Sequence, residues 1–274
     1  MNKEYTQNFG LQWNKHAKLQ LDKFSGRTLS RDRFYRESGW TREELKGKKV
    51  LEAGCGAGRF TQIVLDAGAI VYAFDSSDSV YANEKNNKHK NLHILKSDIM
   101  DLPFEENSFD YVFCFGVLQH TKNPRESFEK LVKYLKPTGK IAIDVYPLFW
   151  KTFFLSRYYL RPFTKGKDPE KLCNFIKNYW VPFWLPISEV VRKIPLVGPK
   201  LRNVVPVENI RGIFSDYDYK RFKEWAILNT FDWLSPRYDK PQKLSTVTKW
   251  FKDSNLKNIK VVLDRNIIMG VGEK

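Results

Sequence analysis

Short apolar runs separated by amphipathic stretches dominate the chain from residue 48 to about residue 147. The runs are rich in β-branched and aromatic residues and apolar on both faces, which is typical of strands buried in a parallel sheet. Between them lie segments such as 124–135, where apolar side chains recur at helical spacing. Strand and helix in alternation predict a Rossmann-like, doubly wound α/β sheet. The five predicted strands are 49–53, 69–74, 92–95, 111–118 and 140–145.

The pattern changes between residues 147 and 243. This stretch holds 20 of the chain's 41 aromatic residues, and its prolines divide it into short helices and loops. The α/β pattern then returns, with a helix that Ser245 caps and that runs to Asp253, followed by two short strands. We therefore predict a largely helical insertion before the last helix and strands. The predicted parts are an N-terminal lid or flank (1–47), a core (48–146), an acceptor-binding cap (147–243) and the end of the core sheet (244–274).

Composition and charge narrow the function classes. Hydrophobic residues make up 42% of the 274 residues, which excludes a chain that is disordered throughout. The N-terminus lacks the apolar segment of a secretion signal, and three widely spaced cysteines predict free thiols and no metal site. We expect a cytoplasmic protein, with a peripheral position on the inner face of the membrane as the alternative. The net charge of +16 favours anionic partners without choosing among them.

The clearest motif is a glycine-rich turn after the first predicted strand. Gly54, Gly56 and Gly58 follow a buried strand and precede a helix. Glycine permits positive φ and lets the backbone approach a ligand closely. The Gly-x-Gly-x-Gly spacing differs from the Gly-x-Gly-x-x-Gly fingerprint of dinucleotide sites. A tight structural turn with no ligand remains the alternative for these glycines.

Polar side chains follow the next three predicted strands. Asp75 ends the second strand, where a carboxylate can accept hydrogen bonds from ribose hydroxyls or cap the helix near Ser76. Asp98 can accept from an adenine amino group while Ile99 or Met100 packs on the purine ring, or Asp98 can be a solvated loop carboxylate. The fourth strand delivers Gln119 and His120 at its carboxyl end. Since the carboxyl ends of parallel strands share one edge, these residues should converge on one crevice.

Together these segments resemble the class I S-adenosylmethionine-dependent methyltransferases. The resemblance covers residues 48–146 through the Glu-Ala-Gly-Cys-Gly-Ala-Gly turn, Asp75, the Asp98 loop, the segment 116–120 and the turn 135–139. It implies a seven-stranded sheet with the last strand antiparallel, and S-adenosylmethionine as cofactor. In similar enzymes an N-terminal segment closes over the cofactor, which suggests Trp13 and Gln20 as contacts. A helix packed on the edge of the sheet is the alternative for both residues. The cofactor-binding residues expected from the resemblance are Trp13, Gln20, Glu52, Gly54, Gly56, Gly58, Asp75, Ser76, Asp98, Ile99 and Gln119.

Three segments of the flanks, residues 9–14, 20–22 and 231–238, resemble a bacterial group of such enzymes whose acceptors are mostly unassigned. His120 is the candidate general base for a hydroxyl acceptor, because its pKa normally lies near neutrality; the alternative is a pocket-wall residue. Asp144 and Tyr146 are weaker candidates for the same role. An amine acceptor needs no base. The expected acceptor-binding residues combine aromatic faces with charge and are Tyr146, Arg211, Asp216, Tyr217, Trp233, Arg237 and Tyr238.

The predicted function is methyl transfer to a small-molecule, sugar or lipid-linked acceptor. The aromatic segments 149–159 and 179–185 form the core of a helical cap or, alternatively, touch a membrane surface. Methylation of RNA is a second hypothesis that the net charge suggests, but no RNA-binding module is recognisable. Two further alternatives are a non-catalytic cofactor-binding protein of this fold and an aminopropyltransferase. The sequence does not indicate an oligomeric state.

Overall fold

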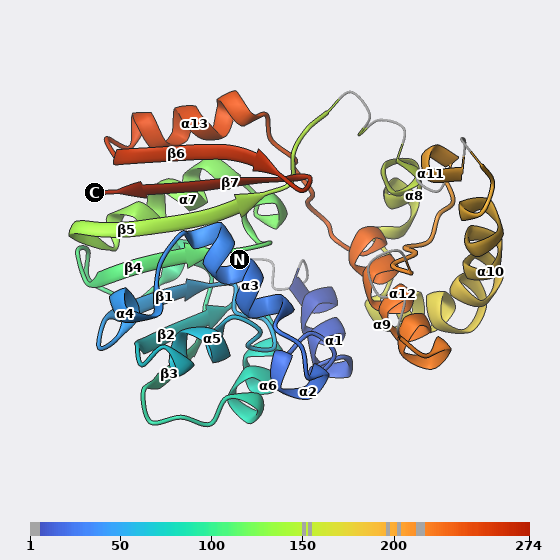
Figure 1. Cartoon of the computed structure of the whole chain (residues 1–274), viewed down its shortest axis with the longest axis horizontal. Helices are drawn as coiled ribbons and strands as arrows, with labels where there is room; N and C mark the ends of the chain where they lie inside the picture. The colour runs from blue at the N-terminus through green and yellow to red at the C-terminus, as the bar shows by residue number, and fades with distance from the viewer. Residues whose placement is uncertain (1–5, 150–151, 153–154, 196–197, 202–203, 212–216) are drawn as a thin grey trace. The chain divides into compact units, whose positions relative to one another are not determined.

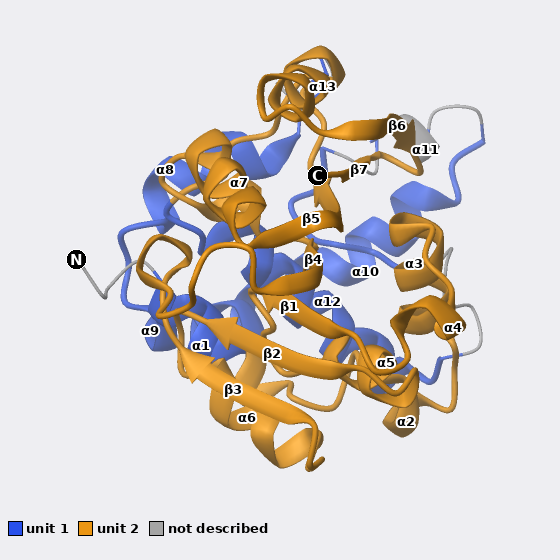
Figure 2. Ribbon diagram, turned by 90° about the vertical axis from the view of Figure 1, so that its left-hand side faces the viewer, with its two compact units in different colours: residues 1–12, 149–237 blue, residues 13–148, 238–274 orange. Residues whose placement is uncertain are grey.

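The computed structural model describes residues 6–149, 152, 155–195, 198–201, 204–211 and 217–274. The chain forms two compact units, which Figure 2 shows in different colours. Unit 1 contains Met1–Gln12 and Phe149–Arg237, and unit 2 contains Trp13–Leu148 and Tyr238–Lys274. The first twelve residues are therefore grouped with the insertion, whereas the sequence placed them in a flank of the core.

Unit 2 is built on a seven-stranded sheet (Figure 1). The strand order is β3-β2-β1-β4-β5-β7-β6; β1 to β5 run parallel, and β7 is antiparallel to both of its neighbours. This confirms the predicted Rossmann-like sheet with an antiparallel last strand. The strands are β1 (Lys49–Ala53), β2 (Ile70–Asp75), β3 (Leu92–Lys96), β4 (Phe109–Cys114), β5 (Leu135–Val145), β6 (Lys257–Asp264) and β7 (Ile267–Glu273).

Alternate residues of each central strand enter two apolar cores. Leu51 of β1 packs with Phe128 and Phe251 on one face of the sheet, whereas Val50 packs with Phe34 on the other. Because successive strand side chains point to opposite faces, runs that are apolar on both faces require helices on both. The helices and short turns of unit 2 are α2 (Asp22–Ser25), α3 (Leu29–Ser38), α4 (Arg42–Leu45), α5 (Thr61–Asp66), α6 (Ser79–Asn86), η2 (Ile99–Asp101), η3 (Leu118–His120), α7 (Pro124–Lys133) and α13 (Leu244–Asp253), and α1 (Gln7–Lys15) crosses the unit boundary.

Three sequence predictions of local structure were wrong. The fourth strand ends at Cys114, not at residue 118, because Gly116 takes φ 74° and the chain then turns into η3. The fifth strand begins at Leu135, five residues earlier than expected, through a register shift against β4. Ser245 lies inside α13, and Lys243 occupies the N-cap position without a side-chain cap. The three cysteines are buried free thiols, as predicted.

The insertion is helical, as predicted. Asn8 donates to Ser235 at 3.0 Å and Gln12 donates to Asp232 at 3.2 Å, so this part of α1 is attached to the C-terminal end of α12 (Tyr219–Leu234). Within the described part of the chain, none of the helices combines the length and apolarity needed to cross a membrane. The helices of unit 1 are α8 (Ser156–Thr164), α9 (Pro169–Phe175), the π-helical η5 (Ile176–Trp180), α10 (Val181–Arg192), α11 (Gly198–Leu201) and α12 (Tyr219–Leu234).

Candidate cofactor site

The glycine turn lies against the ends of β2 and β4. The backbone N–H of Gly54 donates to the carbonyl of Phe74 at 2.8 Å. A Cβ at Gly54 would lie 2.3 Å from a methyl of Val117, and one at Gly58 would lie 2.1 Å from the amide oxygen of Asn83. Both glycines also have positive φ. Only glycine therefore permits this turn to pack between the neighbouring loops.

Asp75 organises the turn from the end of β2. Its Oδ2 accepts from the N–H of Gly56 at 3.0 Å, and its Oδ1 accepts from the N–H and hydroxyl of Ser77 at 2.9 and 2.7 Å. A carboxylate offers about four acceptor sites, so about one remains beside the glycine turn. That leaves room for one ribose hydroxyl, whereas the sequence suggested both. Ser76, the next residue, is partly exposed at the same strand end.

Glu52 lies beneath the turn and is buried. The hydroxyl of Thr61 donates to its Oε2 at 2.5 Å, and the amide of Asn83 donates to that hydroxyl at 2.9 Å. Burial, with a smaller contribution from Asp75, raises the pKa of Glu52 to about 8, although the bond from Thr61 opposes the rise. Glu52 is thus an internal acid that supports the turn from below.

The raised pKa of Glu52 predicts a pH-dependent stability. A folded-state pKa above the unfolded value near 4.5 contributes stability that is present below pH 4.5 and is lost as the pH rises through about 8. Glu52→Gln removes the ionisable group. Between pH 5 and pH 8.5, the free energy of unfolding of this variant should therefore fall by roughly 3 kcal/mol less than that of wild type. Thermal unfolding across this range measures the difference. The exposed Glu84→Gln variant is the control, and parallel pH curves for Glu52→Gln and wild type would contradict the assignment.

The Asp98 loop closes the other side of the strand edge. Asp98 Oδ1 accepts from the N–H of Met100 at 3.0 Å and so caps η2. Ile99 is buried in the apolar core together with Ala53 and Phe74. Both residues lie at the carboxyl edge of β3, where the sequence predicted them, and their contact with the adenine remains a prediction.

Gln119 and His120 follow the end of β4. Gln119 is fully buried, and among the described residues neither its amide nitrogen nor its amide oxygen has a hydrogen-bond partner. His120 is buried, with Nδ1 lying 3.0 Å from the carbonyl of Tyr238. The ring centres of His120 and Tyr146 lie 5.7 Å apart, with the two rings nearly perpendicular. Since a carbonyl only accepts, Nδ1 carries the proton in this contact, and neutral imidazole then has its lone pair on Nε2.

The N-terminal segment covers the turn. The ring of Trp13 lies 3.5 Å from the position of a Cβ at Gly56. The Asn86 amide donates to the carbonyls of Ala17 and Ala57 at 3.0 and 2.9 Å, and so fastens this segment to the turn. Gln20 Oε1 accepts from Arg59 at 3.4 Å. Burial lowers the pKa of Arg59 to about 9, and Arg33 adds to this effect.

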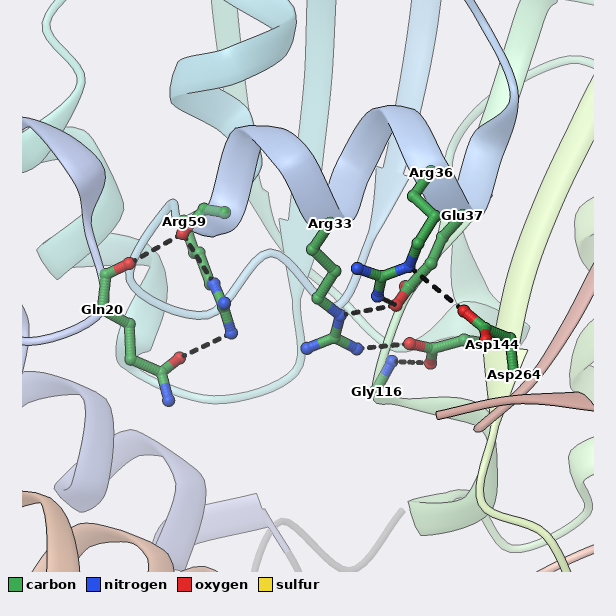
Figure 3. A network of polar contacts seen from close by, with 9 residues as sticks. Gln20, Arg33, Arg36, Glu37, Arg59, Gly116, Asp144 and Asp264 are labelled. Atoms are coloured by element: carbon green, nitrogen blue, oxygen red, sulfur yellow. Dashed lines mark hydrogen bonds and ion pairs between the residues drawn. The ribbon is translucent and has the colours of Figure 1, made fainter. Parts of the chain in front are cut away.

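A polar network that the sequence did not reveal joins α3 to three strand ends (Figure 3). Arg33 donates to Asp144 and to Glu37, the latter at 2.9 Å, and Asp144 also accepts from the N–H of Gly116. Arg36 pairs with Glu37 at 3.0 Å and with Asp264 at 3.5 Å. Burial lowers the pKa of Arg33, but Asp144 and Glu37 outweigh this and raise it. Asp144, a weaker candidate base in the sequence, is therefore held in an ion pair.

Arg33 and Glu37 stand four residues apart on one helix, which was the available sequence signal. That spacing indicates a local pair only. Their link to Asp144 joins positions 111 residues apart in the chain, and no local pattern contains it.

The predicted acceptor residues fall into both units. Tyr146 and Tyr238 lie with His120 in unit 2. In unit 1, Arg211 donates to the carbonyl of Tyr217 at 2.9 Å, and its guanidinium lies 4.2 Å from the centre of the Phe222 ring. These contacts hold the unit together. Of the other predicted acceptor residues in the insertion, Trp233 accepts through its carbonyl from Arg161 at 2.8 Å, and Arg237 is exposed. Asp216 lies outside the described residues. Contact between any of these residues and an acceptor remains a prediction.

Comparison with known proteins identifies the domain that carries this site. Residues 51–143 match a family described as "Methyltransferase domain". The match covers about a third of the chain, so it describes these residues and not the whole protein. S-adenosylmethionine remains the cofactor that the sequence resemblance implies. The matched residues include the end of β1, all of β2 to β4 and most of β5 (Figure 1), the strands whose ends hold the residues above.

Two curated relatives each match a little over a third of this chain. The ubiquinone biosynthesis O-methyltransferase of Coxiella burnetii is 33% identical over 100 residues, which is 35% of this chain and 43% of that protein. The tRNA U34 carboxymethyltransferase of Pseudoalteromonas translucida is 35% identical over 107 residues, which is 37% of this chain and 33% of that protein. The chain thus spans less than half the length of these relatives.

A solved structure supports the fold over a longer span. A putative S-adenosylmethionine-dependent methyltransferase from Listeria monocytogenes superposes with a TM-score of 0.53 at 12% identity, and the match covers 90% of this chain and 99% of that one. At this identity the likeness concerns the fold alone.

The methyltransferase-domain site fits its cofactor on this chain's own features. The amide of Gln119 is buried without a partner among the described residues, Asp75 retains about one acceptor site, and a Cβ at Gly116 would meet nothing within 4 Å. All three lie at the carboxyl ends of β2 and β4, the edge at which α/β sheets bind ligands. A nucleoside with an amino-acid tail requires hydrogen-bond donors, hydrogen-bond acceptors and space beside the backbone, and these three residues offer them.

Proposed function

We propose that this chain transfers the methyl group of S-adenosylmethionine to a small-molecule, sugar or lipid-linked acceptor. The observation that carries the proposal is Gln119. A fully buried amide without hydrogen bonds costs free energy, on the order of 1–3 kcal/mol, unless a ligand supplies partners. Because Val117, two residues earlier, touches the glycine turn, the ligand that satisfies Gln119 lies beside that turn.

Gln119→Leu should separate this role from a structural one. Removing an unsatisfied buried amide should leave the melting temperature of the protein unchanged or raised. Affinity for S-adenosylhomocysteine, the demethylated cofactor, should fall about tenfold or more through the lost hydrogen bonds. Calorimetric titration and thermal unfolding measure the two quantities. A folded Gln119→Leu protein with unaltered affinity would remove Gln119 from the site.

In this proposal, some residues of the site bind the cofactor and His120 transfers a proton. When bound, the cofactor supplies an electrophilic methyl group on a sulfonium centre. Asp75 and the Asp98 loop bind and orient its nucleoside, while Trp13 covers the turn and keeps water out. The carbonyl of Tyr238 holds the proton of His120 on Nδ1, so that Nε2 can take the proton of an acceptor hydroxyl.

His120→Ala therefore tests general-base catalysis. Turnover with a hydroxyl acceptor should fall by roughly 10²- to 10⁴-fold, while affinity for S-adenosylhomocysteine stays the same. The pH profile of turnover should also lose its dependence on the ionisation of the histidine. Equal turnover of His120→Ala and wild type would exclude His120 as the base and favour an acceptor that needs none.

The RNA hypothesis remains the second candidate function, supported by the net charge of +16 and by the matching domain of a tRNA-modifying relative. Labelled methyl from S-adenosylmethionine, supplied to an extract of the source organism with the purified chain, separates the two. Label in the lipid or polar fraction that survives ribonuclease supports the first proposal. Label lost on ribonuclease treatment supports RNA. No transfer, despite binding of S-adenosylhomocysteine, supports a non-catalytic protein.

A further inference from the structure

A row of apolar side chains faces solvent along α9, η5 and α10, which form one continuous helical segment from Pro169 to Arg192. The row repeats at three- or four-residue intervals and continues two residues beyond the helix, and its members are between 36% and 69% exposed. Large apolar side chains seldom line up on a solvent face without a partner. This apolar stripe comprises Phe175, Tyr179, Phe183, Ile187, Val190 and Ile194.

The opposite face of the same segment already supplies the core of unit 1. Leu172, Ile176, Val181 and Leu185 are buried there, and the segment packs on α12. The stripe is therefore not needed to fold the helix. Trp184, which the sequence placed in an interfacial helix, is only partly exposed, and Leu185 is buried. The exposed face includes neither of these residues and extends further toward the C-terminus than predicted.

Basic residues accompany the stripe. Residues 156–194 contain eight basic and three acidic residues, a net charge of +5. Not all of these charges face solvent: Arg161 is buried, and Arg192 pairs with Glu189. The exposed charged residues are Lys165, Lys167, Asp168, Glu170, Lys171, Lys177 and Lys193, so the exposed excess is still basic. The α8 helix repeats the combination, with exposed Tyr159 and Phe163 near basic residues.

We propose that this stripe binds the surface of an anionic lipid membrane. Aromatic and aliphatic side chains on one face, with lysine and arginine around them, suit a helix that lies in the interface between headgroups and acyl chains. A second copy of the chain would bring two like-charged segments together, which opposes dimerisation through this face. The aliphatic half of the stripe, Ile187 to Ile194, offers no rings for stacking nucleic-acid bases.

Membrane binding is a further activity beyond methyl transfer, and it indicates where the chain would meet its methyl acceptor. If the proposed function holds, a chain held at a lipid surface meets lipid-linked acceptors at high local concentration, so the lipid-linked class is preferred over freely soluble acceptors.

The test uses the full chain and vesicles of phosphatidylcholine with or without phosphatidylglycerol. Co-sedimentation should be at least about tenfold stronger with phosphatidylglycerol and should weaken at high salt. The Phe183→Ser/Val190→Ser variant should lose about tenfold in partitioning. The matched control, Tyr81→Ser/Leu263→Ser, replaces one exposed aromatic and one exposed aliphatic residue of unit 2 and should bind like wild type.

Each other outcome overturns the proposal. Absence of partitioning, or equal partitioning of the stripe variant and wild type, would exclude the stripe as a lipid contact. A concentration-dependent dimer that the stripe variant abolishes would assign the stripe to a second copy. Affinity for S-adenosylhomocysteine, measured in parallel on all variants, reports on the cofactor site separately, so failure of the membrane proposal leaves the methyltransferase proposal standing.

Discussion

Replacing Asp75 by alanine is expected to remove measurable binding of S-adenosylhomocysteine at micromolar concentrations. The carboxylate lies at the end of β2, holds the N–H of Gly56 at 3.0 Å and keeps about one acceptor site for a ribose hydroxyl. Hydrogen bonds to charged groups contribute about 1.5–3 kcal/mol each, and the turn also loses its anchor. Together these losses correspond to a decrease in affinity of roughly 100-fold or more.

Two variants make the Asp75 result interpretable. Asp75→Asn keeps the size and one acceptor oxygen, so its affinity should lie between wild type and Asp75→Ala. Asp78→Ala removes an exposed carboxylate three residues further on, whose partner is Lys96, and should leave affinity unchanged. Calorimetric titration gives the affinities, and circular dichroism confirms folding. A folded Asp75→Ala protein that binds like wild type would show that the ribose lies elsewhere.

The Arg33→Met substitution is expected to destabilise the protein by about 3–5 kcal/mol. It leaves Glu37 and Asp144, whose side chains are 0% and 1% exposed, without the guanidinium that compensates them. Burial and the neighbouring Asp144 already raise the pKa of Glu37, which shows how poorly this site tolerates a second negative charge. Thermal and denaturant unfolding of the variant and wild type at pH 8 measure the loss.

Two further variants of the same network test the Arg33→Met result (Figure 3). Arg36→Met removes a more exposed arginine that also contacts Glu37 and should cost about 1 kcal/mol or less. Adding Asp144→Asn to Arg33→Met removes one unpaired charge but keeps an acceptor for the N–H of Gly116, and should recover part of the loss. Arg33→Met within about 1 kcal/mol of wild type would contradict a structural role for the buried pair.

Local sequence patterns predicted which segments form strands more accurately than they predicted where those strands end. Runs apolar on both faces identified β1 to β5, because only strands covered by helices on both sides carry them. The end of β4 was misjudged because Phe115, Val117 and Leu118 are apolar although Gly116 at φ 74° has already turned the chain. Hydropathy indicates burial, and Phe115 and Leu118 stay buried although they lie beyond the end of β4.

The candidate site was predictable where a single segment carries it. The glycine turn, Asp75 and the Gln119-His120 pair follow strand ends whose parallel order places them at one edge. The contacts that fix their chemistry join distant segments: Tyr238 with His120, and Arg33 with Asp144. Only the folded chain brings these partners together. The apolar stripe was missed in part because a helical repeat does not show which of its faces is buried.

The two ends of the insertion are joined where they leave unit 2. The N–H of Leu148 donates to the carbonyl of Gln242 at 2.7 Å, and the N–H of Gln242 donates to the carbonyl of Tyr146 at 2.8 Å. These two bonds hold the ends of the insertion together. The entropic cost of closing the inserted segment therefore rises only slowly with the length of the segment. Such a junction can hold inserted segments of different lengths between β5 and α13 without a change in the glycine turn. A graft of a foreign segment between residues 148 and 242 would meet the same permissive junction.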